Sequence, residues 1–208
     1  MFGIIGKALV AFGLAGVGLL AVAATSLASP EASSFAAAGP ETSVPYGWVD
    51  FCQRYASECA SEEGVPADID LTASAFSKIS RINSWVNKSI SPVADNDHWG
   101  AIDAWDYPTD GRGDCEDYAL LKRRMLIEEG FPREALLLTV VKDKNGDGHS
   151  ILTIRTNRGD FVLDNLSDRV KPWTKTPYRF VKRQSQQNPN IWVSLGAPTA
   201  APAYVSNQ

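Results

Sequence analysis

The sequence predicts an α+β domain in which a central helix packs on an antiparallel sheet. Helical patterns come first along the chain, and short strand patterns separated by turn signals follow them, an order that is typical of this class. Residues 45–196 also supply one domain's worth of chain, which is enough to bury a sizeable core.

The N-terminal residues form a stretch that is unlike the rest of the chain. Lys7 is the only charged side chain before Glu31, and residues 8–24 are an unbroken apolar and glycine run followed by small residues. This order predicts a secretory signal peptide at residues 1–28, cleaved after Ala28. The alternative is an uncleaved membrane anchor, because the run is near the lower length limit for a membrane span. Both interpretations place the rest of the protein outside the cytoplasm.

Composition divides the remainder of the chain. Residues 29–44 are rich in Ala, Ser, Pro and Glu without apolar periodicity, and we expect a flexible linker there. We expect residues 45–196 to form the folded domain and residues 197–208 a flexible tail. The net charge of −4 and the lack of a basic stripe argue against nucleic acid as a partner. We expect the one basic cluster, Lys122–Arg124, to be a solvated helix face.

The first helical pattern, Trp48–Ala60, contains two of the three cysteines. In an oxidising compartment Cys52 and Cys59 are the natural disulfide pair. Seven residues span ~10.5 Å along a straight helix, whereas bridged cysteines prefer a Cα separation of about 5.5 Å, so the chain must turn near residues 56–57. Two free buried thiols are the alternative. Either way Cys115 is left unpaired.

Two further helices flank a long loop. Leu71–Ile90 carries apolar residues at three- and four-residue steps and is expected to be an amphipathic helix. Residues 91–113 lack periodicity but are rich in aromatic residues and aspartate, which indicates a functional loop. We expect its His98 to serve surface or loop packing. Cys115–Glu129 is the clearest helix, with Asp114 as its N-cap and the cysteine at the first helical position.

Short strand patterns occupy the C-terminal part of the chain. The predicted strands are Ala135–Lys142, His149–Thr156, Asp160–Leu166, Tyr178–Arg183 and Ile191–Leu195. The segment from Asp143 to Gly148 matches the first positions of an EF-hand calcium loop, but Ile154 stands where a bidentate Glu is required. We therefore expect a hairpin turn, which presents His149 at the start of a strand.

A histidine and an aspartate on neighbouring predicted strands are candidates for catalysis. If the hairpin turns at residues 157–159, Asp164 lies diagonally across from His149, whereas a slip of one residue would point it to the opposite face. With Cys115 at a helix start, these residues match the pattern of a thiol nucleophile with an oriented base.

These motifs resemble the bacterial transglutaminase-like cysteine proteinases. The similar blocks are GDCEDYALLK, GHSILTIRT and GDFVLDNL, followed by Trp173, Tyr178 and Arg183-Gln184-Ser185, within a region from about Trp48 to Leu195. The resemblance implies a papain-like, transglutaminase-type core with a catalytic triad of Cys115, His149 and Asp164.

The resemblance also implies a calcium ion beside the nucleophile, bound by acids matching Asp114 and Glu116, with Asp117 as a further candidate. These three carboxylates around Cys115 would otherwise disfavour its thiolate by like-charge repulsion. A divalent cation would cancel that repulsion, and an oxygen-rich cluster suits calcium. The alternative is that the acids only cap the helix and interact with its dipole.

The expected function is that of an exported, calcium-dependent cysteine endopeptidase that forms a thioester acyl-enzyme, which water resolves. The backbone N–H of Cys115 is expected in the oxyanion hole, with Trp99 or another loop residue as a candidate second donor. The family implies a periplasmic location and a protein substrate, with a large surface adhesin as candidate, regulation by an inner-membrane cyclic-di-GMP receptor, and an effect on biofilm. Two alternatives stay open: a transglutaminase-like acyl transferase, and a noncatalytic calcium-dependent binding module.

Overall fold

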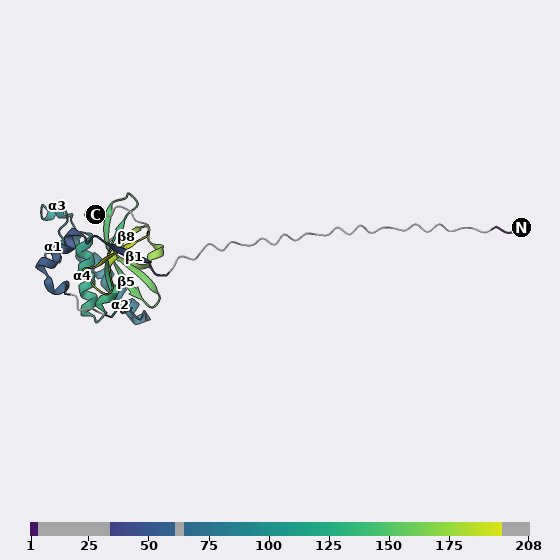
Figure 1. Ribbon diagram of the computed structural model, residues 1–208, viewed down its shortest axis with the longest axis horizontal. Coiled ribbons are helices and arrows are strands. Elements are labelled where there is room, and N and C mark those ends of the chain that lie inside the picture. Colours follow the sequence, from purple (N-terminus) through teal and green to yellow (C-terminus); the bar gives the residue numbers. More distant parts are fainter. Residues whose placement is uncertain (4–33, 61–64, 197–208) are drawn as a thin grey trace. The chain divides into compact units, whose positions relative to one another are not determined.

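The computed structural model describes residues 1–3, 34–60 and 65–196 (Figure 1). The expected tail and, apart from residues 1–3, the expected signal peptide lie outside these described residues. In the described part of the chain, no helix is both long enough and apolar enough to cross a membrane. The helices and strands of the described residues all belong to one compact unit.

The central feature is a seven-stranded sheet in which every neighbouring pair of strands is antiparallel. In spatial order its strands are β1 (Ala38–Thr42), β9 (Trp192–Leu195), β8 (Arg179–Gln184), β4 (Leu136–Lys142), β5 (Gly148–Thr156), β6 (Gly159–Asp164) and β7 (Ser167–Pro172). The sheet confirms the predicted α+β class, and five of its strands are those that the sequence predicts, with small shifts at their ends.

Both edge strands are additions to the predicted sheet. Residues 38–42, which were expected within a flexible linker, pair with β9 as strand β1. Just before them, the Ala36 N–H donates a hydrogen bond of 2.9 Å to the buried Asp160 carboxylate. The expected domain boundary at residue 45 is therefore corrected, because the folded unit already includes β1. At the opposite edge lies β7, which is polar, with its residues half-buried or exposed, and so carries no strong strand pattern.

Three main helices lie together beside the sheet (Figure 1). They are α1 (Tyr46–Arg54), α2 (Ala73–Ser89) and α4 (Cys115–Glu128). Shorter elements are the helix α3 (Asp95–His98), the 3-10 turns η1 (Ala56–Glu58), η2 (Arg133–Ala135) and η3 (Trp173–Lys175), and a parallel pair of β2 (Ser91–Pro92) with β3 (Arg112–Gly113). Helix α2 begins where the Thr72 hydroxyl accepts a hydrogen bond from the Ala75 N–H, as a capping residue does.

The sheet is buried on both faces by alternating side chains. Leu152 and Leu163 belong to the main core, with apolar residues of α1, α2 and α4 such as Ile79 and Leu126. Ile151 and its neighbours across the sheet form a second, smaller cluster on the opposite face. His149 shares a strand face with Ile151, so it points away from the main core.

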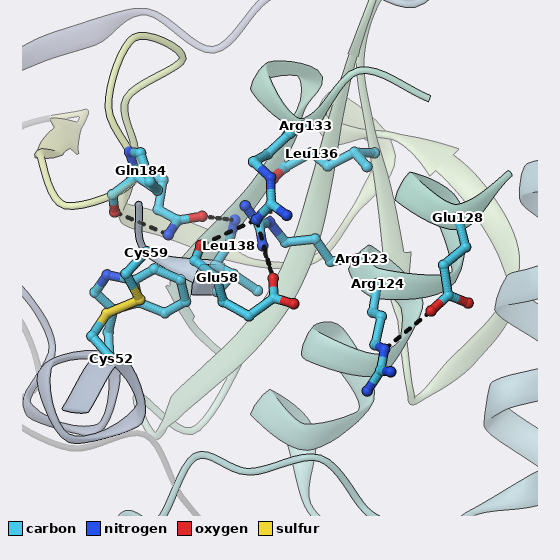
Figure 2. A network of polar contacts seen from close by, with 12 residues as sticks. Cys52, Glu58, Cys59, Arg123, Arg124, Glu128, Arg133, Leu136, Leu138 and Gln184 are labelled. Atoms are coloured by element: carbon cyan, nitrogen blue, oxygen red, sulfur yellow. Dashed lines mark hydrogen bonds and ion pairs between the residues drawn. A yellow bond between two sulfur atoms is a disulfide. The ribbon is translucent and has the colours of Figure 1, made fainter. Parts of the chain in front are cut away.

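A disulfide and an ion-pair network hold η1 against the centre of the domain (Figure 2). Cys52 and Cys59 are bridged with a Cα separation of 5.6 Å, which confirms the predicted pair, and the helix ends between them as the spacing requires. Glu58 in η1 then pairs with Arg133 at 3.1 Å and with Arg123 of α4 at 3.4 Å.

The basic cluster Lys122–Arg124 is not the solvated face that the sequence suggested. Lys122 and Arg123 are buried, and the Arg123 guanidinium donates to the Leu136 carbonyl at 3.1 Å. Only Arg124 is exposed, where it pairs with Glu128 on the same helix. The expectation is wrong because α4 is covered around most of its circumference, so its side chains include buried cations.

Candidate active site

Cys115 lies at the first position of α4, against the sheet. Its side chain is 1% exposed, and its Sγ accepts a hydrogen bond of 3.3 Å from the Ser150 N–H in β5. The chain can enter the helix here because Gly113 has no side chain: a Cβ would lie 2.5 Å from the Asp117 carboxylate. Asp114 occupies the predicted N-cap position without a capping hydrogen bond. Its carboxylate instead accepts from the Asp95 N–H at 3.3 Å.

His149 and Asp164 meet across the β5–β6 hairpin. Leu152 pairs with Leu163, and this register places Asp164 diagonally across from His149, as predicted. The Nε2 atom of His149 lies 3.0 Å from Oδ1 of Asp164. Because that nitrogen faces the aspartate, Nδ1 is the ring nitrogen left for Cys115.

The partners of His149 favour its protonated form. Burial by itself lowers the pKa of His149, but the Asp164 hydrogen bond and the interaction with Cys115 outweigh burial and raise the pKa to about 10. Burial likewise raises the pKa of Asp164, but the His149 and Tyr178 hydrogen bonds prevail and hold it below its ordinary value. The pair therefore behaves as an imidazolium beside a carboxylate near neutral pH.

Asp164 has further partners that fix its orientation. The Tyr178 hydroxyl donates to Oδ2 at 2.6 Å, and the Leu166 N–H donates to Oδ1 at 3.1 Å. The Tyr178 ring also lies 5.3 Å from the His149 ring, centroid to centroid. The sequence assigns Tyr178 no role beyond its place in the family resemblance, because its position depends on the path of β7 and η3, which carry no periodic signal.

Five buried carboxylates surround the start of α4. Two overlapping groups each bring carboxylate oxygens within 4.8 Å of one another: Asp95, Asp103 and Glu116 in one, and Asp95, Asp114 and Asp117 in the other. The three predicted acids therefore lie close together, but in two groups. Glu116 belongs to one group, Asp114 and Asp117 belong to the other, and Asp95 is common to both. Sequence reasoning missed the two loop residues, since nothing in an aperiodic loop rich in aspartate distinguishes the ones that fold inward.

The geometry of these acids fits a divalent cation. Within the described residues, Oδ1 of Asp95 and Oε1 of Glu116 are buried and accept no hydrogen bond. Burial, followed by repulsion from neighbouring acids and Cys115, raises the pKa of Glu116 well above its ordinary value. Burial also raises the pKa of Asp117 to about 9, despite hydrogen bonds from backbone groups. Clustered buried carboxylates with unsatisfied oxygens are the ligand set that a hard cation such as calcium takes.

Other polar groups have the structural roles that the sequence predicted. The His98 ring stacks on Trp99 at 3.9 Å and lies 2.9 Å from the Asp110 carboxylate, which confirms loop packing. The segment after β4 is a hairpin turn, closed by the hydrogen bond from the Asp143 N–H to the Asp147 carbonyl and by Gly146 at φ +91°. Trp99 is 55% exposed, and its proposed part in an oxyanion hole stays a prediction.

Comparisons with known proteins identify the family. The model of the bacterial transglutaminase-like cysteine proteinase family matches residues 38–200. Among solved structures, calcium-bound LapG of Legionella pneumophila is 21% identical over 61% of this chain and 75% of its own, with a TM-score of 0.49. EGTA-treated LapG of the same organism is 24% identical over 60% of this chain and 68% of its own, with a TM-score of 0.46. Curated protein sequences give no match. Since the family match covers most of its length, the chain belongs to the bacterial transglutaminase-like cysteine proteinases.

Proposed function

We propose that the protein is an exported, calcium-dependent cysteine endopeptidase with Cys115, His149 and Asp164 as its catalytic triad. One observation carries the proposal: the thiol of Cys115 contacts the backbone of Ser150, next to a histidine whose Nε2 is held at 3.0 Å by an aspartate. A helix-start cysteine and an oriented imidazole are the parts that thiol-dependent acyl transfer requires.

The mechanism follows from the placement of the ring nitrogens. In the reactive state the Sγ proton of Cys115 resides on Nδ1 of His149, the imidazolium that Asp164 holds through Nε2, and the thiolate attacks the carbonyl carbon of a peptide bond. The amine product leaves with the proton from His149, and a thioester remains on Cys115. Water, deprotonated by His149, attacks this thioester, releases the carboxylic acid and restores the thiol. The N–H of Cys115, like other first-turn amides without an intrahelical partner, is a donor for the oxyanion.

The five buried carboxylates would hold the calcium ion, with Asp95 common to both groups. The ion would supply positive charge that compensates the acids beside the nucleophile. In this chain the acid in contact with the thiol is Glu116: the Cys115 thiol donates to its Oε2 at 3.1 Å. A cation that bound the Glu116 carboxylate would draw it away from the thiol. The Cys115 thiol could then interact with His149 instead.

The proposed location rests on the N-terminal signal pattern and the family resemblance, and the proposed substrate rests on the family resemblance alone. We propose a periplasmic protease whose substrate is a large cell-surface adhesin, restrained by an inner-membrane cyclic-di-GMP receptor. Deleting the gene is then expected to increase adhesin retention at the cell surface and to increase biofilm. Unchanged adhesin in the deletion strain would count against this role.

A cleavage assay with an amine acceptor separates the candidate reactions. The purified protein is incubated with bacterial surface proteins, calcium and a labelled primary amine, and new amino termini are counted by mass spectrometry. We expect new termini from the wild type, none from Cys115→Ala or His149→Ala, and most of the activity from His98→Ala, which changes the only other histidine. Amine incorporation without new termini would instead indicate an acyl transferase. If neither new termini nor amine incorporation is found, and the biological effect survives Cys115→Ala, the protein is a binding module.

A further inference from the structure

A cavity of about 150 Å³ opens beside the catalytic aspartate. Its walls are the β6–β7 hairpin and the segment that leads into β8, and the side chains that matter here are Asp164, Arg169, Lys171 and Tyr178. Since a water molecule occupies about 30 Å³ of liquid, the cavity has room for one polar side chain.

Strand register brings both cations to the face that carries the catalytic aspartate. Along β7, Lys171 pairs with Val162 and Ser167 pairs with Asp164. Val170 and Asp168 alternate with these residues and point to the opposite face of the sheet. Val170 packs on the main core, and the Asp168 carboxylate accepts a hydrogen bond from Asn87 of α2 at 3.1 Å. Arg169 therefore lies on the same face as Lys171, and both line the cavity.

The cavity has an excess of positive charge. Asp164 is the only acid among its lining residues, and its two oxygens are already engaged by His149 and Tyr178. In the described part of the chain, the side chains of Arg169 and Lys171 make no ion pair or hydrogen bond. These two cations make the cavity locally positive, although the net charge of the chain is −4.

We propose that this cavity is a specificity subsite that binds the side chain of a glutamate or aspartate of the protein substrate. A carboxylate is the group that Arg169 and Lys171 can both pair with, and the Tyr178 wall would pack against its stem. The cavity begins at Asp164, so a peptide held at Cys115 reaches it within a few residues, at about 3.3 Å per residue. This inference rests on the proposed protease function and names its substrate class.

The test uses short alanine peptides in which an electrophilic double bond replaces one peptide bond. Cys115 adds to the double bond, and mass spectrometry gives the rate of modification. A single glutamate is moved through the positions on both sides of the double bond, and each peptide is compared with its glutamine counterpart. We expect the glutamate peptide to react about tenfold faster than the glutamine peptide at one position, and this preference to shrink in high salt.

Two charge-reversal variants test whether the preference for glutamate peptides arises in the cavity. Arg169→Glu should abolish it, whereas Arg158→Glu, the same charge change on the exposed β5–β6 turn, should keep it. Labelling by iodoacetamide, which needs no subsite, should be equal in both variants. Equal rates for glutamate and glutamine at every position, with normal iodoacetamide labelling, would overturn the subsite and leave the protease intact. Absent labelling by every probe would overturn the proposed function and the subsite with it.

Discussion

Asp164 is the residue at which the hydrogen bonds of the candidate site converge. Its carboxylate is hydrogen-bonded to the His149 ring, the Tyr178 hydroxyl and the Leu166 N–H. Its backbone carbonyl accepts a hydrogen bond of 3.0 Å from the Asn87 side chain of α2. A buried carboxylate with this many donors is held in one orientation, and it fixes the imidazole in turn. Tyr178 thus has a positioning role that acts through Asp164.

Changing Tyr178 to Phe tests this role, because only the hydroxyl is lost. Without it the pKa of Asp164 should rise, and the rate of Cys115 alkylation should fall about tenfold. An aspartate with a depressed folded pKa stabilises the fold above its ordinary pKa, and this stability is lost as pH falls through the folded value. Acid unfolding of the variant should therefore begin at a higher pH than in the wild type. Coincident acid-unfolding curves followed by circular dichroism would refute the positioning role.

At this scale the sequence predicts the triad but only part of the metal site. Cys115 is marked by its helix start, and Asp164 by a hairpin whose short turn fixes the register. Asp95 and Asp103 carry no such signal, because the fold of their loop depends on contacts with α4 rather than on local pattern.

Among the elements, the edge strand β1 decides where the folded unit begins along the chain. Strand β1 is short and polar, so its stability comes from pairing with β9 and from the Ala36 contact with Asp160. The buried strands β4 to β6 and the helices α2 and α4 carry runs or stripes of apolar residues and are predictable from sequence. The edge strands β1 and β7 are short, polar and contain proline, as is common where a strand edge must not pair with another chain, so an apolar pattern does not reveal them.

Two truncations test whether β1 belongs to the domain. A chain that begins at residue 44 loses the pairing with β9 and the Ala36 hydrogen bond, whereas a chain that begins at residue 34 keeps both. The shorter chain should be less stable in urea by roughly 2 kcal/mol or more, given about 1 kcal/mol for each lost hydrogen bond. Equal free energies of unfolding would mean that residues 34–43 are only a tether.

For the whole molecule, the start of α4 is where helix, sheet and loop meet. The helix supplies Cys115 and Glu116, the sheet supplies His149, and the loop between β2 and β3 supplies Asp95. A cation bound by acids from both the loop and the helix would therefore tie a distant segment of the chain to the nucleophile. Such a tie would make the reactivity of the Cys115 thiol depend on the fold of the entire domain.

The rate at which iodoacetamide alkylates Cys115 is the sharpest test of how this thiol is activated. It is measured with calcium and with a chelator, in the wild type, His149→Ala and Asp95→Asn. We predict rapid alkylation of the wild type in calcium, at least about tenfold slower alkylation in chelator or in His149→Ala, and a rate for Asp95→Asn that calcium does not change. Uniformly slow alkylation, indifferent to calcium and to His149, would contradict the claim that a cation and an imidazole together activate this thiol.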